Sequence, residues 1–419
     1  MQRLRNILTF LRPFAFYSML ALAFFIPLHV RMSINLIGVV AVLAIITGRW
    51  SGWGQRLRRN WPVLLIWGFW LMHVIGIAYS SEVRHAVNDV VHKLSFVVMP
   101  LVFTLVELDE RKRYNVASAF VLGCLCSMLI MLGRATVAAA APESTAVLPH
   151  FMYCELTRPF HPTFFAMYLA LALAIALHRL YDASQPAKWR KAYAFFVLLL
   201  MVFCYLITSR AGIFVMLVAL VFVTLVRFKY GRVALIAMGG LGLIAGLVIM
   251  VGVLRTGSTD SVVAGLLHHN RLRGYTTDTQ QDARLLIWSC VPEALEGHWL
   301  LGYGPNCSQP ALTAIYEQRG YIGLNSIHHS HNQFFQTGLD IGIVGVLLLI
   351  AMLAYPFLMR VGRMHEHTIA LVFVAIVLLH FMFDTMLDYI AGIMFFAFFY
   401  GLFFCAQGEE LSAPKCSRP

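Results

Sequence analysis

Long apolar runs separated by short polar segments occupy most of the chain. The run 233–253 contains no charged residue, and the run 334–359 contains only Asp340. Helices of this length, at 1.5 Å per residue, cross about 30 Å of hydrocarbon. The pattern therefore predicts an all-α polytopic membrane protein with about twelve transmembrane helices. The predicted spans are 14–30, 33–47, 61–79, 91–106, 116–132, 163–178, 192–208, 212–226, 233–253, 334–359, 368–384 and 386–405.

The first run, 14–30, follows Arg3, Arg5 and Arg12 and therefore resembles a secretory signal peptide. Its apolar core is long, however, and no small-residue cleavage motif follows it. We therefore expect this segment to be retained as the first membrane span.

Basic residues gather on alternate connections between the predicted spans, within 49–59, 111–113, 179–191, 227–232 and 360–363. Cytoplasmic loops of membrane proteins carry this excess of Lys and Arg, so both termini are predicted to face the cytoplasm. The net charge of +12 then comes mostly from the Lys and Arg residues of the cytoplasmic loops, and no nucleic-acid partner is expected. Only 12% of the 419 residues are charged and 60% are apolar, which agrees with a membrane location.

The predicted topology leaves one long extracytoplasmic loop. Residues 1–253 would form the first nine spans, 254–333 the loop, 334–405 the last three spans and 406–419 a cytoplasmic tail. Within the loop, helix signals predict one helix over about 282–295 and another that Pro310 opens and Gly320 closes. Cys290 and Cys307 share this loop, and their spacing leaves open whether they form a disulfide.

The segment 328–333, which reads His-His-Ser-His-Asn-Gln, immediately precedes a long apolar span. His331 and Asn332 would lie at the helix N-terminus, where the helix dipole disfavours a protonated imidazole. A neutral His331 could act as a general base, with His329 and Asn332 in support. Alternatively, the segment only caps the helix in solvent. A zinc site of His328, His329 and His331 is less favoured, because no carboxylate or cysteine neighbours them.

Several arginines lie close to predicted membrane surfaces on the extracytoplasmic side. Arg210 follows Thr208-Ser209 between two spans, and Arg284 lies on the predicted loop helix. Arginine near hydrocarbon is costly and binds anions with a planar fork, so both are candidates for holding a phosphate. Arg158 and His161 at the mouth of the sixth span could join them. Snorkelling to lipid headgroups, or local ion pairs, are the structural alternatives.

Acidic residues at membrane depth usually need a partner. Asp384 and Asp388 lie near the junction of the last two spans, and Asp388 is the preferred partner for an arginine of the site. Together these residues suggest an anionic, lipid-linked phosphate substrate and a histidine that moves a proton. No Gly-rich nucleotide-binding loop of the P-loop type is present, so a preactivated lipid donor would supply the energy.

The sequence resembles the O-antigen ligase and polymerase superfamily. The resemblance rests on four segments: Ser209-Arg210-Ala211-Gly212, Ala283-Arg284, Leu301-Gly302-Tyr303-Gly304, and His331-Asn332-Gln333-Phe334-Phe335 running into Gly342-Ile343-Val344-Gly345. About twelve spans with one large periplasmic loop after the ninth also fit.

The resemblance implies an inverting, metal-independent glycosyltransferase of the GT-C class that needs no cofactor. It would move O-antigen polysaccharide from undecaprenyl pyrophosphate to lipid A-core oligosaccharide, at the periplasmic face of the bacterial inner membrane. By the match, His331 is the catalytic histidine, and Arg210 and Arg284 hold the pyrophosphate. The short tail makes the protein-glycosylating branch less favoured than the ligase branch.

Two other functions remain open from the sequence. An O-antigen polymerase would extend the lipid-linked glycan instead of transferring it to the core. A lipid-phosphate transporter or flippase would also have a dozen spans and phosphate-binding arginines. Transporters usually place charges near the middle of their helices, whereas the polar residues here gather at one face.

Overall fold

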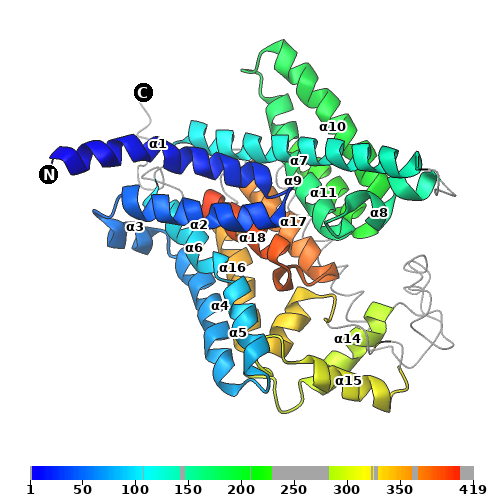
Figure 1. Ribbon diagram of the computed structural model, residues 1–419. Helices are drawn as coiled ribbons and strands as arrows, with labels where there is room; N and C mark the ends of the chain where they lie inside the picture. Colours follow the sequence, from blue (N-terminus) through cyan, green and yellow to red (C-terminus); the bar gives the residue numbers. More distant parts are fainter. Residues whose placement is uncertain are drawn as a thin grey trace.

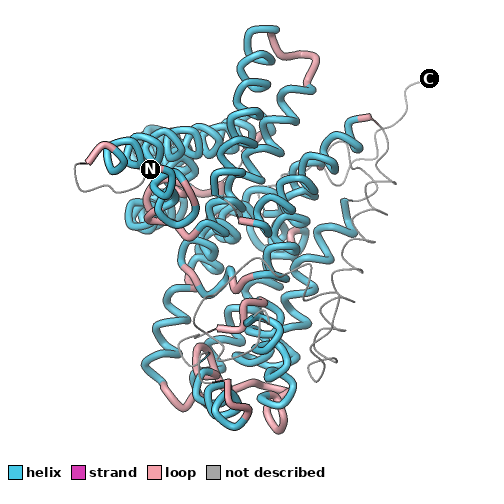
Figure 2. The backbone as a smooth tube through the Cα atoms, turned by 90° about the vertical axis from the view of Figure 1, so that its right-hand side faces the viewer, coloured by secondary structure: helices cyan, strands magenta, loops and turns pink. Residues whose placement is uncertain are grey.

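The computed structural model describes residues 2–106, 108–141, 147–207, 209–228, 283–321, 324, 329–360 and 367–405. Over these residues the chain forms helices joined by turns, with no strand (Figure 2). The predicted span 233–253, the first part of the large loop and the tail 406–419 lie outside the described residues.

Eight of the described helical segments are long and apolar enough to cross a membrane, and three shorter apolar helices accompany them. The polytopic membrane class is therefore confirmed, while the count of about twelve stays a prediction. The helices that carry the predicted spans are α1 (Gln2–Phe25), α2 (Val30–Thr47), α4 (Pro62–Gly76), α6 (Ser95–Leu105), α7 (Glu110–Ala139), α9 (Pro162–Tyr181), α10 (Ala187–Ile207), α11 (Arg210–Arg227), α16 (Gln333–Arg360), α17 (Thr368–Phe383) and α18 (Ile390–Tyr400).

The first two helices form an antiparallel pair that lies along α7 (Figure 1). Large apolar side chains such as Phe10, Phe14 and Tyr17 are exposed on α1. Exposed apolar surface of this kind suits contact with lipid, where an apolar side chain loses nothing by leaving water. The N-terminal pair therefore forms an outer layer of the bundle.

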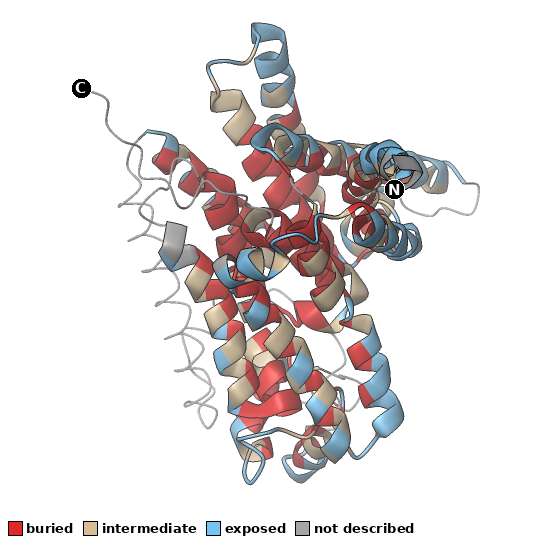
Figure 3. Ribbon diagram, turned by 90° about the vertical axis from the view of Figure 1, so that its left-hand side faces the viewer, coloured by how far each residue is buried: buried red, intermediate tan, exposed pale blue. Residues whose placement is uncertain are grey.

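Helix α9 lies at the centre of the bundle. Every residue from Pro162 to Leu177 is buried, and the helix packs against α7, α10, α11 and α17 (Figure 3). A helix that is apolar on all sides is expected to be surrounded by other helices. Its N-terminus, capped by His161, opens onto the candidate site described below.

The second half of the large loop forms a small helical unit. It comprises α14 (Ala283–Ala294) and α15 (Gln309–Gln318), which confirms the two helices predicted there. Both contribute to a separate apolar core around Ile287, Val291 and Tyr316. Cys290 and Cys307 are buried here as free thiols, so no disulfide joins them in this structure.

Helix α16, predicted as one continuous span, is broken in its N-terminal half. Ile341 and Gly342 have non-helical backbone angles, and Gly342 has a φ of 68°. The break frees the carbonyl groups of Leu339 and Asp340, which accept hydrogen bonds from the N–H groups of Tyr303 (2.8 Å) and Gly304 (2.9 Å). The turn of residues 302–306 therefore provides hydrogen-bond donors for the carbonyl groups at the break, so these buried backbone groups remain paired.

Candidate active site

Asn332 begins α16 as a side-chain cap. Its Oδ1 accepts hydrogen bonds from the N–H groups of Phe334 (3.0 Å) and Phe335 (3.1 Å), and its Nδ2 donates to the carbonyl oxygen of Met382 (3.2 Å). The cap satisfies N–H groups that have no partner within the helix. This contact also ties the start of α16 to the end of α17, as needed to bring His331 near the last two helices.

His331 lies just before this cap, as predicted. Its φ of 52° is uncommon for a residue with a side chain, and such conformations concentrate at functional sites. The imidazole Nδ1 is 3.7 Å from the Oδ1 of Asp384, which follows the end of α17. The ring remains about a quarter exposed, at 23%, so it is reachable by a substrate.

Asp384 is almost fully buried beside His331, with 4% of its surface exposed. Burial raises the pKa of this carboxyl, but the neighbouring His331 ring and the positive charges of Arg284 and His329 outweigh it and lower the pKa to about 2. The carboxylate is therefore ionised at neutral pH. An ionised carboxylate facing one ring nitrogen orients a histidine and stabilises its protonated form.

His329 forms the second part of the cluster. Its Nε2 is 2.9 Å from the hydroxyl oxygen of Tyr389, and its ring centre is 4.2 Å from that of His331. Burial, followed by the charges of Asp384 and Asp388, raises the pKa of Tyr389 to about 12. Tyr389 is therefore a neutral hydroxyl at physiological pH, and it fixes the orientation of the His329 ring.

Arg284 reaches the same cluster from the first turn of α14. Its side chain is partly buried, and its charge contributes to the lowered pKa of Asp384. The indole Nε1 of Trp288, one turn further along α14, donates to the carbonyl oxygen of Ser330 (2.8 Å). This bond fixes α14 against the histidine segment, so the predicted loop arginine and the predicted histidine lie on one side of the molecule.

Arg210 is the first residue of α11, and its side chain lies outside what the structure describes. The residues around it have clear backbone roles. The Ser209 hydroxyl accepts a hydrogen bond from the N–H of Gly212 (3.2 Å), which caps the helix. A Cβ on Gly212 would collide with Ala166 of α9. The Ser-Arg-Ala-Gly segment is therefore a capped helix start held tightly against the central helix.

Arg158 and His161 have different surroundings. Arg158 is exposed, and its guanidinium pairs with Glu155 at 2.8 Å, which is the local ion pair considered from the sequence. The Nδ1 of His161 accepts from the N–H of Thr163 (3.4 Å) and caps α9. Loss of hydration lowers the pKa of His161, and the charges of Asp384, His331 and Arg284 also act on it. His161 is thus close to the cluster, whereas Arg158 engages its own helix.

In the folded chain the histidines lie beside the carboxylate of Asp384, which is far from them in the sequence. Ligand atoms of His329, His331 and Asp384 all lie within 4.8 Å of one another. Two imidazoles and a carboxylate are common metal ligands, so this group could offer three bonds to an ion. The sequence argument against a zinc site assumed no nearby carboxylate. On that point it was wrong, because Asp384 is more than 50 positions away along the chain.

Asp388, the acidic residue preferred from the sequence, is directed elsewhere. It lines a polar cavity with Asp89 and Asp340, while Asp384 accompanies the histidines. Tyr389 and Gln333 were not singled out from the sequence. The Gln333 Oε1 accepts a hydrogen bond from the N–H of Leu387 (2.6 Å) and so anchors the segment that carries both aspartates.

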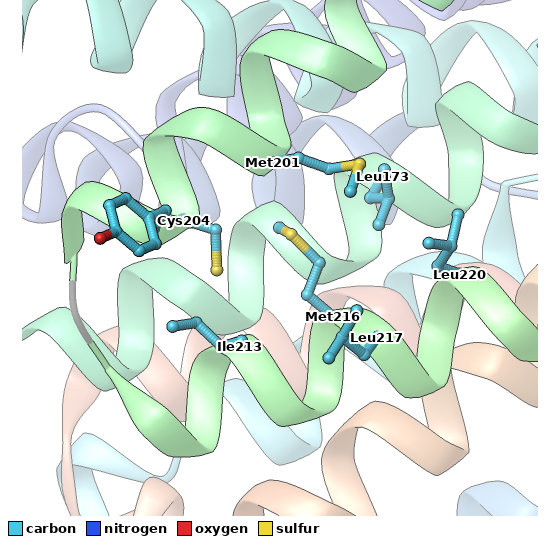
Figure 4. Close-up of a pocket in the computed structure, with 8 residues that line it drawn as sticks. Leu173, Met201, Cys204, Ile213, Met216, Leu217 and Leu220 are labelled. Atoms are coloured by element: carbon cyan, nitrogen blue, oxygen red, sulfur yellow. The ribbon is translucent and has the colours of Figure 1, made fainter.

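An apolar cavity of about 90 Å³ lies between α9, α10 and α11. Its lining begins about one turn after Arg210, the first residue of α11. Figure 4 shows Cys204 of α10 and Met216 of α11 directed into the space between these helices. The lining is otherwise leucine, methionine, isoleucine and tyrosine. A lining of this composition favours apolar groups over polar ones.

Comparison with known protein families assigns residues 194–350 to the family described as O-antigen ligase. The matched region contains most of α10, all of α11, α14 and α15, and the first part of α16. It therefore includes Arg210, Arg284 and His331. The match confirms the family resemblance drawn from the sequence. No curated protein matches the chain.

Proposed function

With residues 194–350 assigned to the O-antigen ligase family, we propose that the protein is an inverting, metal-independent glycosyltransferase. It moves O-antigen polysaccharide from undecaprenyl pyrophosphate to lipid A-core oligosaccharide at the periplasmic face of the inner membrane. The observation that carries the proposal is the pairing of His331 with the buried, ionised Asp384 beside Arg284.

In this proposal His331 is the general base. With Nδ1 directed at Asp384, the other ring nitrogen, Nε2, takes the proton from a hydroxyl group of the acceptor sugar. The separation of 3.7 Å is longer than a hydrogen bond, and catalytic contacts of this kind often tighten only when substrate binds. Asp384 then stabilises the imidazolium that forms, as the carboxylate does in other acid–base pairs.

The bond changes are those of a direct displacement. The acceptor oxygen forms a bond to C1 of the donor sugar, the C1–oxygen bond to the pyrophosphate breaks, and the pyrophosphate leaves with the bonding electrons. Attack from the opposite face inverts C1. Arg284 and Arg210 stabilise the negative charge that grows on the leaving group, a task that a metal ion performs in other enzymes.

The apolar cavity between α9, α10 and α11 supports a lipid-linked donor. It lies on the helices that carry the start of α11, so an isoprenoid chain held there would present its pyrophosphate toward Arg210. The pyrophosphate of such a donor is already an activated leaving group. No nucleotide is then required on the extracytoplasmic side.

O-antigen polymerase is the alternative within the family. It would use the same base and arginines, and differs only in the acceptor. A transporter is less well supported, because the described ionisable residues of the site converge around one histidine rather than along a path through the helices.

The test is in vitro transfer with purified protein, lipid-linked glycan and lipid A-core. A ladder of glycan on the core supports the ligase, whereas growth of the lipid-linked glycan indicates the polymerase. Arg284→Ala should lose most activity and Arg284→Lys should regain only part, because an ammonium cannot reproduce the fork of the guanidinium. Arg84→Ala, an exposed arginine of α5 (Val83–His92), is the matched control. Inactivation by a chelator, reversed by a divalent ion, would contradict the metal-independent mechanism.

A further inference from the structure

A second polar site lies beside the proposed catalytic cluster. It is a cavity of about 170 Å³ between α5, the turn of residues 302–306, the first part of α16 and the short helix η5 (Met386–Asp388). The side chains that line it are Asn88, Asp89, His92, Asn306, Asp340 and Asp388. None of these residues has a role in the proposed proton transfer.

Three carboxylates at this cavity surround one lysine. Lys93, which is 1% exposed, donates a hydrogen bond to the Oδ1 of Asp89 at 2.5 Å. The second oxygen of Asp89, Oδ2, has no hydrogen-bond partner among the described residues, although the side chain is nine-tenths buried. A buried carboxylate oxygen without a donor is costly, which indicates that a ligand supplies one.

The cavity is connected to His331 by a buried polar face of α16. Gln336 accepts a hydrogen bond from the N–H of Ser330 (3.0 Å) through its Oε1 and donates to Asp340 (3.1 Å) through its Nε2. The rise of α16 from Gln333 to Asp340 is about 10 Å, which is within reach of a short oligosaccharide. Along α16, the cavity therefore lies within the length of a short oligosaccharide from His331.

We propose that this cavity binds a sugar residue of the glycan, with Asp89, Asp340 and Asp388 accepting hydrogen bonds from its hydroxyl groups and Asn88 completing the contacts. The proposal rests on the glycosyltransferase function proposed above. The ligand is a neutral pyranose that belongs to either the acceptor or the donor glycan.

The charge balance of the cavity favours a sugar over a metal ion. Lys93 neutralises Asp89, and burial, opposed by the charge of Lys93 and aided by that of Asp89, raises the pKa of Asp388 to about 7. A substantial part of the Asp388 population is therefore protonated near neutral pH. The cavity then offers donors and acceptors together, as sugar hydroxyls need. A hard cation prefers ionised oxygen ligands without an ammonium nearby.

The experiment measures binding and transfer separately. Saturation-transfer NMR with purified protein and either soluble core oligosaccharide or soluble O-antigen fragment reports binding without any reaction. Asn88→Ala, at the exposed rim, and Asp388→Asn should each weaken binding of one of the two glycans by about tenfold, the loss expected for a hydrogen bond to a charged or strongly polar group. The glycan that loses affinity identifies the source of the sugar.

Transfer kinetics provide the second measurement. The same variants should raise KM for that glycan about tenfold while kcat stays within about twofold, since the base is untouched. Glu317→Gln, an exposed acid of α15, is the control and should behave as wild type. Asn88 is exposed, so its variant keeps the test valid if Asp388→Asn fails to fold.

Wild-type binding and KM in both variants, in a protein that transfers glycan, would overturn the sugar site alone. Stoichiometric Ca²⁺ or Mg²⁺ binding in calorimetry that is lost in Asp340→Asn would also overturn it, in favour of a cation. Absence of any transfer by the wild-type protein would instead contradict the proposed function. The two failures are therefore distinguishable.

Discussion

Around His331, neighbouring residues fix the position and the orientation of the ring. Asp384 faces its Nδ1, His329 lies against its ring, and Asn332 holds the backbone at the start of α16. The Asn332 cap is local and can be read from the sequence. The Asp384 contact depends on how α16 and α17 pack, so it becomes visible only in the folded chain.

We expect His331→Ala to reduce transfer by about 10²–10⁴-fold, the usual cost of removing a general base. Donor binding should persist, because the pyrophosphate contacts belong to the arginines. Rates in the in vitro assay and donor binding by calorimetry test the two halves. His298→Ala, an exposed histidine of the same loop, should leave both unchanged. Near-normal turnover of His331→Ala would assign the proton to another group.

Asp384→Asn should lower kcat at every pH between about 5 and 9, because the carboxylate with its pKa of about 2 is ionised across that range. A lowered pKa also means that Asp384 stabilises the fold at neutral pH and loses this contribution as pH falls from about 4 to 2. An unchanged kcat in Asp384→Asn at pH 7, measured in the in vitro transfer assay, would show that the carboxylate contributes nothing to the proposed base.

At the scale of elements, two glycine-containing segments are joined by backbone hydrogen bonds. Gly302-Tyr303-Gly304 and Gly342-Ile343-Val344-Gly345 are separate motifs in the sequence. The first donates N–H groups to the carbonyl groups of Leu339 and Asp340, which the break at Gly342 leaves unpaired. The sequence predicted the turn and the apolar span correctly. It did not predict the break, because isolated glycines in an apolar run are compatible with a straight helix.

Gly342→Ala should lower the free energy of unfolding by more than this glycine-specific backbone conformation alone would cost a side chain, which is about 1–3 kcal/mol. At a φ of 68°, its Cβ would collide with the carbonyl of Leu300. Gly320→Ala is the matched control, since its φ of 71° is similar but its Cβ would meet open space. Thermal unfolding in detergent compares the two. Equal losses would show that the contact with residue 300 contributes nothing.

Two aspartates, one just before the short helix η5 and one at its end, have pKa values shifted in opposite directions. Asp384, just before it, has a lowered pKa, while burial of Asp388 at its end raises that pKa to about 7. They are four positions apart in the sequence, which favoured Asp388 as the partner of the site, whereas the structure places Asp384 beside His331. Their pKa values differ because the turn directs the Asp384 side chain toward His331 and the Asp388 side chain into the cavity lined by Asp89 and Asp340.

Asp388→Asn should stabilise the protein clearly at pH 8 and much less at pH 5. A raised pKa means that the folded state keeps the proton that the unfolded state loses, so the free energy of unfolding falls as pH rises from about 4 to 7. Removing the charge should recover about 1–3 kcal/mol at pH 8, allowing for water near the cavity. Thermal melts at the two pH values measure it. A variant that is less stable at pH 8 would show that the charged form is favoured in the fold.

For the whole molecule, the sequence predicted the helical membrane class and most helix positions, because apolar length and basic flanks are local signals. The orientation of the protein in the membrane remains a prediction, and the proposed chemistry depends on it. It places α14, α15 and His331 outside the cytoplasm, and the connection between α9 and α10 inside it. The lipid-linked donor and the core acceptor would meet only on the outer side.

Labelling with a membrane-impermeant maleimide tests this orientation in a variant without native cysteines. Gln318→Cys, exposed at the end of α15, should react in intact spheroplasts, and Ser184→Cys, exposed between α9 and α10, should react only after lysis. The reason is the excess of Lys and Arg on the second connection, with Lys188, Arg190 and Lys191 close to Ser184. The reverse pattern would place His331 and Asp384 in the cytoplasm, where nucleotide-activated donors are available. The case for a preactivated lipid donor would then be lost, even if every contact in the site were correct.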